Sequence, residues 1–221
     1  MSINVAIDGP AGAGKSTIAK LIAKKMGYIY VDTGAMYRAM ALYFIRNGIK
    51  AEDTQMVSEK CKDADISIAY RDGEQVVLLD DENVNGLIRT EEVGNMASAT
   101  SANKNVRQKL VELQKKLATN ADVVMDGRDI GTVVLPNADV KIYLTASSSV
   151  RAKRRYDELI AKGEKADLAT IEADIIERDH RDMTREISPL RQADDAVLVD
   201  SSYMTIDEVV QTVVDLIANA Q

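Results

Sequence analysis

The sequence predicts an α/β fold of three layers, with a parallel β-sheet between helices. Short apolar runs rich in Val and Ile alternate with longer stretches of helical periodicity along most of the 221 residues. Continuous apolar runs of this length are typical of strands buried on both faces, as in a parallel sheet. One segment near residue 70 breaks the rhythm and predicts a small antiparallel insertion.

The first part of the core alternates strand, helix, strand and helix. Ile3–Ile7 is an apolar run that ends at Asp-Gly-Pro, which predicts a buried strand followed by a loop. Ser16–Met26 shows apolar residues at helical spacing. Tyr28–Val31 is a second short strand, and Met36–Ile45 is a second helix that an Asn-Gly pair ends.

The last part of the core repeats this pattern. Val123–Met125, Val140–Leu144 and Ala196–Val199 are predicted as three further buried strands. Helical patterns separate or follow them, and the last of these is Ile206–Ile217.

The middle of the chain predicts a hairpin. Ile66–Tyr70 and Val76–Leu79 flank Asp72-Gly73, a pair that favours a tight hairpin turn. Helical stretches follow near 90–101 and 103–118. The predicted boundaries are a core of about 1–61 and 101–221 and an insertion of about 62–100 that carries its own small sheet.

Composition and charge limit the class of protein. The net charge of −7 disfavours non-specific binding to nucleic acid or to an anionic membrane. We find neither a signal peptide nor an apolar run long enough to span a membrane, so we expect a cytoplasmic protein. A single cysteine gives no disulfide framework.

A phosphate-binding loop lies between the first predicted strand and helix. The pattern G-x-x-x-x-G-K-[ST] is complete, and its context of strand before and helix after is the required one. Glycines let backbone N–H groups converge on phosphates, Lys15 reaches the β- and γ-phosphates, and the Ser16 hydroxyl binds Mg²⁺. The matching residues are Gly9, Pro10, Ala11, Gly12, Ala13, Gly14, Lys15 and Ser16, with Thr17 next.

Other signals separate the classes of protein that use such a loop. The chain has no D-x-x-G switch, and the segment that starts at Asn103-Lys104 lacks the Asp of a guanine-binding motif, which argues against a GTPase. A motor ATPase normally needs a larger assembly, so a small-molecule kinase is the reading that remains. Asp126 follows an apolar strand, where such proteins keep a carboxylate that organises Mg²⁺.

Arginines gather in the second half of the chain. Arg178, Arg181, Asp182 and Arg185 have the spacing of one helical face, and Arg151, Arg154 and Arg155 form a second group. A solvated charged face explains such spacing in most proteins. Beside a phosphate loop, however, cations are needed around the moving group and the acceptor.

Four segments make the chain resemble the bacterial cytidylate kinases along nearly its whole length. The D-G-F-P-R motif of adenylate kinases is absent. Thr33 stands where some members have serine, and it keeps the hydroxyl. The four segments are Gly9–Thr17, Asp32–Arg38, Asp126–Val134 and Glu177–Asp182.

The resemblance implies transfer of a phosphoryl group from ATP to CMP, and also to dCMP, by a monomer that uses Mg²⁺. Lys15 and the arginines 128, 154, 178 and 185 would be catalytic, and Ser16 and Asp126 would organise the metal. The hairpin insertion would be the domain that binds the monophosphate. The implied contacts are Ser98, Arg107 and Asp129 for cytosine, Arg178 and Asp182 for the sugar, Arg38, Arg128 and Arg185 with Thr33 for the acceptor phosphate, and Arg154 and Arg155 in a lid of about 151–166 over ATP.

The chemistry of the base agrees with this implication. Cytosine carries an amino donor where uracil carries a carbonyl acceptor. A carboxylate such as Asp129 would accept from the amino group, and an arginine such as Arg107 would donate to the acceptors beside it. Two alternatives stay open: a P-loop kinase with another small acceptor, and an ATP-binding regulatory module that transfers nothing.

Overall fold

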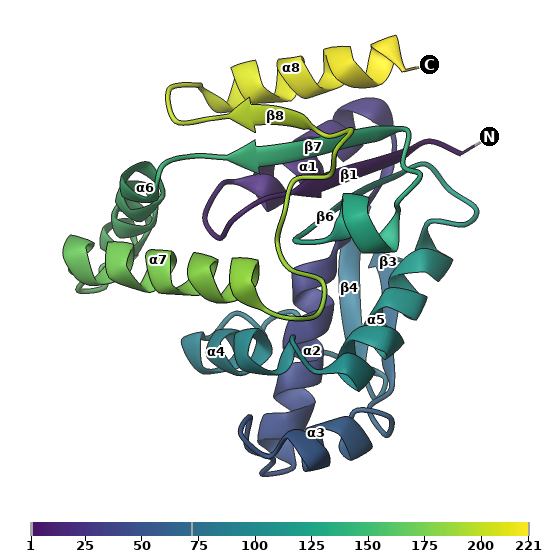
Figure 1. Ribbon diagram of the computed structural model, residues 1–221, viewed down its shortest axis with the longest axis vertical. Helices are drawn as coiled ribbons and strands as arrows, with labels where there is room; N and C mark the ends of the chain where they lie inside the picture. Colours follow the sequence, from purple (N-terminus) through teal and green to yellow (C-terminus); the bar gives the residue numbers. More distant parts are fainter. Residues whose placement is uncertain (1, 72, 221) are drawn as a thin grey trace. The chain divides into compact units, whose positions relative to one another are not determined.

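The main sheet has five strands drawn from both ends of the chain (Figure 1). The computed structural model describes residues 2–71 and 73–220. β7 pairs in parallel with β1, with Val5 opposite Val140, and in parallel with β8. The predicted α/β fold is therefore confirmed. In spatial order the strands are β2 (Ile29–Asp32), β6 (Val123–Gly127), β1 (Asn4–Asp8), β7 (Val140–Thr145) and β8 (Val197–Asp200).

Residue contacts divide the chain into two compact units. The first comprises residues 3–28 and 124–220, and the second comprises Ile29–Val123. The core and insertion boundaries predicted from sequence rest on a different criterion, the place where the strand-helix rhythm breaks. Those boundaries stay a prediction.

The first unit holds four helices and the strands that carry the phosphate loop. α8 (Ile206–Asn219) begins with a capping box, in which Thr205 and Glu208 bond each other's backbone amides. Its apolar face, including Val213 and Ile217, is buried. It packs on β7 and on α1. The other helices are α1 (Lys15–Met26), α6 (Ser148–Ala161) and α7 (Leu168–Thr184), and α6 packs along α7.

The second unit contains the predicted hairpin and its helices. β3 (Ile66–Arg71) and β4 (Glu74–Leu79) pair antiparallel, with Ile66 opposite Leu79, which confirms the hairpin. Asp72, part of the predicted turn, lies outside the described residues. Phe44, fully buried on α2, belongs to the core of this unit. The remaining elements are α2 (Thr33–Arg46), α3 (Thr54–Lys60), β5 (Glu82–Asn83), α4 (Glu91–Thr100) and α5 (Lys104–Leu117).

Three elements were not predicted, and α7 ends one residue before Arg185. The new elements are α3, β5 and the π-helical turn η1 (Ile130–Val134). α7 ends at Thr184, and Arg185 has extended backbone angles of φ −60° and ψ 140°. Its amide still donates to the Arg181 oxygen, and its guanidinium lies near Asp182, so Arg185 extends the predicted face as the C-cap of α7. Within residues 2–71 and 73–220, no helix has the length and hydropathy needed to span a membrane.

Candidate active site

The phosphate loop runs from the end of β1 into α1, as its sequence predicts. Gly9 must be glycine, because a Cβ there would lie 1.9 Å from the backbone oxygen of Leu144. Gly12 and Gly14 adopt φ values of 74° and 86°, in the left-handed region that favours glycine. Gly14 is the N-cap of α1 and offers no side-chain acceptor to the first turn. The amides at this helix end are thus suited to an anion.

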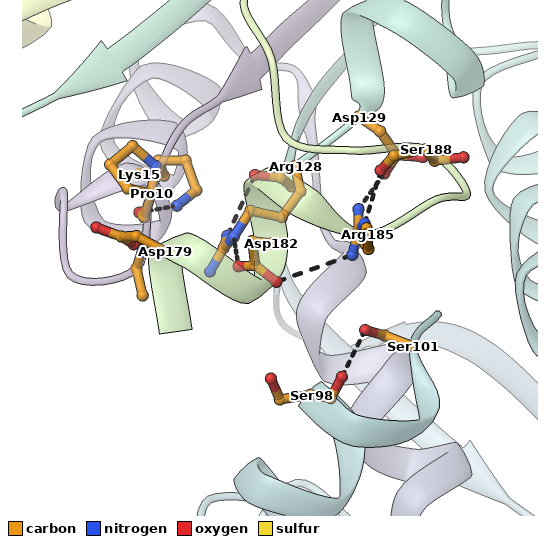
Figure 2. A network of polar contacts seen from close by, with 12 residues as sticks. Pro10, Lys15, Ser98, Ser101, Arg128, Asp129, Asp179, Asp182, Arg185 and Ser188 are labelled. Carbon is orange, nitrogen blue, oxygen red and sulfur yellow. Dashed lines mark hydrogen bonds and ion pairs between the residues drawn. The ribbon is translucent and has the colours of Figure 1, made fainter. Parts of the chain in front are cut away.

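Lys15 is held inside the loop. Its side chain is buried, and Nζ donates to the Pro10 carbonyl oxygen at 2.7 Å (Figure 2). Burial and then the positive charge of Arg128 lower the pKa of Lys15 from 10.5 to about 7, against the pull of nearby carboxylates. An anionic phosphate beside this nitrogen would favour its charged form. A bound phosphate would therefore raise the pKa of Lys15 and keep its ammonium group charged.

Ser16 and Asp126 form a candidate magnesium site. Ser16 Oγ donates to Asp126 Oδ2 at 3.0 Å, and Asp126 is buried at the end of β6. Among residues 2–71 and 73–220 there is no cluster of three His, Cys, Asp or Glu side chains that would enclose a metal. Mg²⁺ in kinases usually takes one or two protein oxygens and completes its shell with phosphates and water. The residues present fit that mode of binding.

A network of arginines and aspartates lies in the same unit (Figure 2). Arg128 Nε donates to Asp182 Oδ2 at 2.9 Å. Arg185 lies 3.9 Å from Asp182 and 4.0 Å from Asp129, and its Nε donates to the Ser188 oxygen at 2.7 Å. Asp182 and the Arg185 guanidinium are largely removed from solvent. Four residues of the predicted acceptor site, Arg128, Asp129, Asp182 and Arg185, are thus brought together.

The charge of this network favours an ionised Asp182. Burial raises the pKa of Asp182, but the charge of Arg128 and its hydrogen bond outweigh burial, helped by the charges of Arg185 and Arg178. The net result is a pKa below the ordinary value of 3.8. The two arginines of the network balance its two carboxylates, and Arg178, whose charge also lowers the pKa of Asp182, adds a surplus positive charge. Such a surplus suits a ligand phosphate.

Asp8 holds the turn that carries part of this network. Its Oδ1 accepts from the Ile130 amide at 2.8 Å, and its Oδ2 accepts from the Gly131 amide at 2.7 Å. These are the first two amides of η1, whose own N-cap residue, Asp129, makes no side-chain capping hydrogen bond. Burial raises the pKa of Asp8 to about 6, although the two backbone hydrogen bonds oppose this. Asp8 thus fixes the segment that presents Arg128 and Asp129.

The second unit holds four more of the predicted acceptor residues, whereas Arg178 lies on α7 in the first unit. Thr33 is buried at the start of α2, and Asp32 caps that helix by accepting from the Ala35 amide at 2.9 Å. Arg38 donates to the backbone oxygen of Ile88 at 3.2 Å. The remaining predicted contacts are Ser98 on α4 and Arg107 on α5.

Arg107 is the more buried of the two residues predicted to read the base from the second unit. Its guanidinium lies 5.5 Å from the centre of the Tyr37 ring, and Nη1 donates to the backbone oxygen of Ser101 at 3.2 Å. Ser101 Oγ in turn donates to the backbone oxygen of Ser98 at 2.9 Å. Ser98 and Arg107 are therefore joined through Ser101. Asp129, the third predicted reader, belongs to the other unit.

The arginines of α6 have three different environments. Arg154 donates to the Ser201 backbone oxygen at 2.7 Å and is partly buried. Arg155 is exposed and lies 3.3 Å from Glu158. Arg151 is buried, with its guanidinium directed at backbone oxygens and at Asp179. Only the first two retain the accessibility that a lid over a nucleotide needs.

Sequence reasoning did not identify Asp8 and Asp179 as parts of the site. Asp8 stands directly before the loop, yet its partners lie more than 120 residues away. Asp179 sits among charged residues, and its burial is not visible in that pattern. The Asp-Gly-Pro that ends the first strand was the one available signal for Asp8.

Comparison with known proteins supplies the family. The family model described as "Cytidylate kinase" matches residues 5–219. A cytidylate kinase of Caldicellulosiruptor saccharolyticus is 52% identical over 97% of this chain and 95% of its own length. One of Ligilactobacillus salivarius is 50% identical over 97% and 96%. In structure, an uncharacterised protein of Eubacterium ventriosum is similar with a TM-score of 0.54, 13% identity and 99% coverage of both chains.

Proposed function

Because the chain belongs to the cytidylate kinase family, we propose that it transfers the γ-phosphoryl group of ATP to CMP and dCMP. The observation that carries the proposal is the network of Arg128, Asp182, Arg185 and Asp129 in the same unit as the phosphate loop. A loop for the donor phosphates and arginines for an acceptor phosphate are the two parts that phosphoryl transfer between nucleotides requires.

The donor side uses the loop and the first turn of α1. Backbone amides and Lys15 bind the β- and γ-phosphates, and Lys15 stabilises the charge that grows on the moving group. Mg²⁺, held through Ser16 and Asp126, neutralises phosphate charge when bound. Arg154 and Arg155 act from α6 as lid residues toward ATP.

The acceptor side needs no general base, since the attacking atom is a phosphate oxygen that is already ionised. Its residues position the acceptor and offset negative charge. Arg38, Arg128 and Arg185 hold the acceptor phosphate, with Thr33 beside them. Arg178 and Asp182 bind the sugar. The ionised form of Asp182 suits a sugar hydroxyl, which donates to a carboxylate.

Base choice falls to Ser98, Arg107 and Asp129. A carboxylate accepts from the cytosine amino group and repels the uracil carbonyl at the same position. The proposal further includes a monomeric, cytoplasmic enzyme without a nucleic-acid partner, in line with the net charge of −7. Sedimentation of the purified protein tests the monomer.

A competition experiment tests the choice of acceptor. The protein receives ATP, Mg²⁺ and equal concentrations of CMP, dCMP, UMP, AMP and GMP, and the diphosphates are separated by ion-exchange chromatography. We expect CDP and dCDP to form first. Because ADP forms from ATP in every turnover, use of AMP is read from the loss of AMP. Preferential loss of AMP or formation of GDP would replace CMP with another acceptor, and consumption of ATP without loss of any monophosphate would reject the kinase.

A further inference from the structure

A buried ion pair contacts the backbone of Ala11, in the phosphate loop, through both its N–H and its carbonyl oxygen. Arg151 Nη1 donates to the Ala11 carbonyl oxygen at 2.7 Å. The Ala11 amide donates to Asp179 Oδ1 at 3.3 Å. Arg151 Nη2 lies 2.6 Å from Asp179 Oδ2, so the two side chains and the Ala11 backbone close a ring of polar contacts.

With one more contact, each of the three nitrogens of the Arg151 guanidinium has a partner. Its Nε donates to the Ala146 backbone oxygen at 2.8 Å, at the start of α6. The side chains of Arg151 and Asp179 are only 6% and 12% exposed. A Cβ at Gly12 would meet the Arg151 Cβ at 3.4 Å, so the loop backbone also packs on the stem of this arginine. Arg151 is therefore built into the loop and is not a lid residue.

A gain in the stability of the fold does not explain by itself why Arg151 and Asp179 form a buried ion pair. Removing two charges from water costs about as much as their attraction returns, and apolar replacements are often as stable. The loop gives a better reason. Gly12 and Gly14 lie in left-handed conformations that only a flexible, glycine-rich backbone reaches, and the same flexibility allows other conformations. A loop that is not held would have to be ordered by its ligand, at a cost in affinity.

We propose that Arg151 and Asp179 are positioning residues that preshape the phosphate loop for the donor nucleotide by fixing the two peptide groups that flank the Ala11 Cα. This proposal rests on the proposed function to the extent that the loop binds the phosphates of ATP. Asp179 lies on α7 three residues before Asp182, which pairs with Arg128 at 2.9 Å. One helix thus touches the donor loop through Asp179 and the arginine network through Asp182.

The decisive variants separate positioning from stability. R151K keeps the positive charge, but a single ammonium nitrogen cannot reach the three acceptors that the three nitrogens of the guanidinium contact. D179N keeps the shape of the side chain and removes the counter-charge. The double variant R151M/D179L removes both charges and leaves apolar groups of similar volume, so that it regains thermal stability lost in D179N. K153M, on the exposed face of α6, breaks the ion pair of Lys153 with Asp157 and is the control for loss of an ion pair on the same helix away from the loop.

The readouts are the dissociation constant of Mg-ADP by calorimetry, the KM values for ATP and CMP, and the melting temperature. We expect R151K and R151M/D179L to raise the Mg-ADP dissociation constant and the ATP KM by about tenfold, or about 1.4 kcal/mol. The CMP KM should stay within about twofold, and K153M should match the wild type. If D179N fails to fold, R151K and the double variant still decide.

Two results would overturn the proposal. The first is a stable R151M/D179L protein with wild-type affinity for Mg-ADP, because the pair would then only stabilise the fold. The second is R151K with wild-type affinity for Mg-ADP. Calorimetry with Mg-ADP needs no acceptor, so a wild-type protein that binds Mg-ADP but forms no CDP would reject the proposed function and leave this test intact.

Discussion

Replacement of Asp8 by Asn should remove a specific step from the pH dependence of folding. Burial raises the pKa of Asp8 from 3.8 to about 6 in the folded protein. The carboxyl group therefore binds its proton more tightly when folded, so its contribution to stability is full below pH 3.8 and is lost as the pH rises through about 6. The difference of about two pKa units corresponds to about 3 kcal/mol, since one unit is 1.36 kcal/mol.

The assay is urea denaturation of wild type and D8N between pH 4 and pH 8. Groups that do not interact with Asp8 titrate alike in both proteins and cancel in the difference between their free energies of unfolding. Asp129 and Lys15 do interact with Asp8, so the measured step includes their response to its charge. We expect wild type to lose about 2 kcal/mol relative to D8N between pH 4 and pH 7, because the carboxyl group of the unfolded chain is already more than half ionised at pH 4. A difference that is constant over this range would refute the reasoning.

The same variant tests the role of Asp8 in the site. An amide has one acceptor oxygen, so in D8N either the Ile130 or the Gly131 amide faces an NH₂ group. We expect kcat/KM for CMP at pH 7.5 to fall by at least tenfold through displacement of the turn, because a buried amide without an acceptor costs about 1–3 kcal/mol. D139N, which alters an exposed carboxylate in the same unit, should keep wild-type activity.

Three further substitutions test other parts of the site. K15M should lower kcat by about 100-fold or more with little change in the CMP KM, because its charge acts mainly on the transition state; near-normal turnover would contradict the role of the loop. D129A should shrink the ratio of kcat/KM for CMP over UMP by about tenfold to a hundredfold, whereas equal losses for both would show that Asp129 only supports the turn. D182N should lower the free energy of unfolding at pH 7 by about 3 kcal/mol, since Arg128 loses a buried partner. Because the pKa of Asp182 lies below 3.8 in the folded protein, this deficit should shrink as the pH falls from 3.8 through that lowered pKa, and a deficit that does not change with pH would argue against the ion pair.

Local patterns made much of the fold predictable. The apolar runs of β1 and β7, and the glycine-rich loop between β1 and α1, depend on residues next to each other in sequence. The hairpin of β3 and β4 is local in the same sense, since its strands are joined by a short turn. Short or irregular elements escape such patterns. α3 has only seven residues, and the π-helical η1 has no periodicity that distinguishes it from a loop.

The burial of charged side chains could not be predicted from the sequence. Arg151 has the spacing of a solvated helical face, yet it lies beneath the phosphate loop with Asp179 as its partner. Asp8 resembles a turn residue, yet it caps a helix that begins 122 positions later. Both contacts join segments that are distant in the chain, and no local periodicity encodes them. The resemblance to a known family predicts ligand residues, but it does not predict the residues that hold them in place.

The most direct test of the proposed function is ³¹P NMR of ATP, CMP and Mg²⁺ with a catalytic amount of protein. Wild type should convert ATP and CMP to ADP and CDP in equal amounts, with little inorganic phosphate, and K15M should do so at least 100-fold more slowly. Formation of ADP and inorganic phosphate without CDP would contradict phosphoryl transfer to CMP.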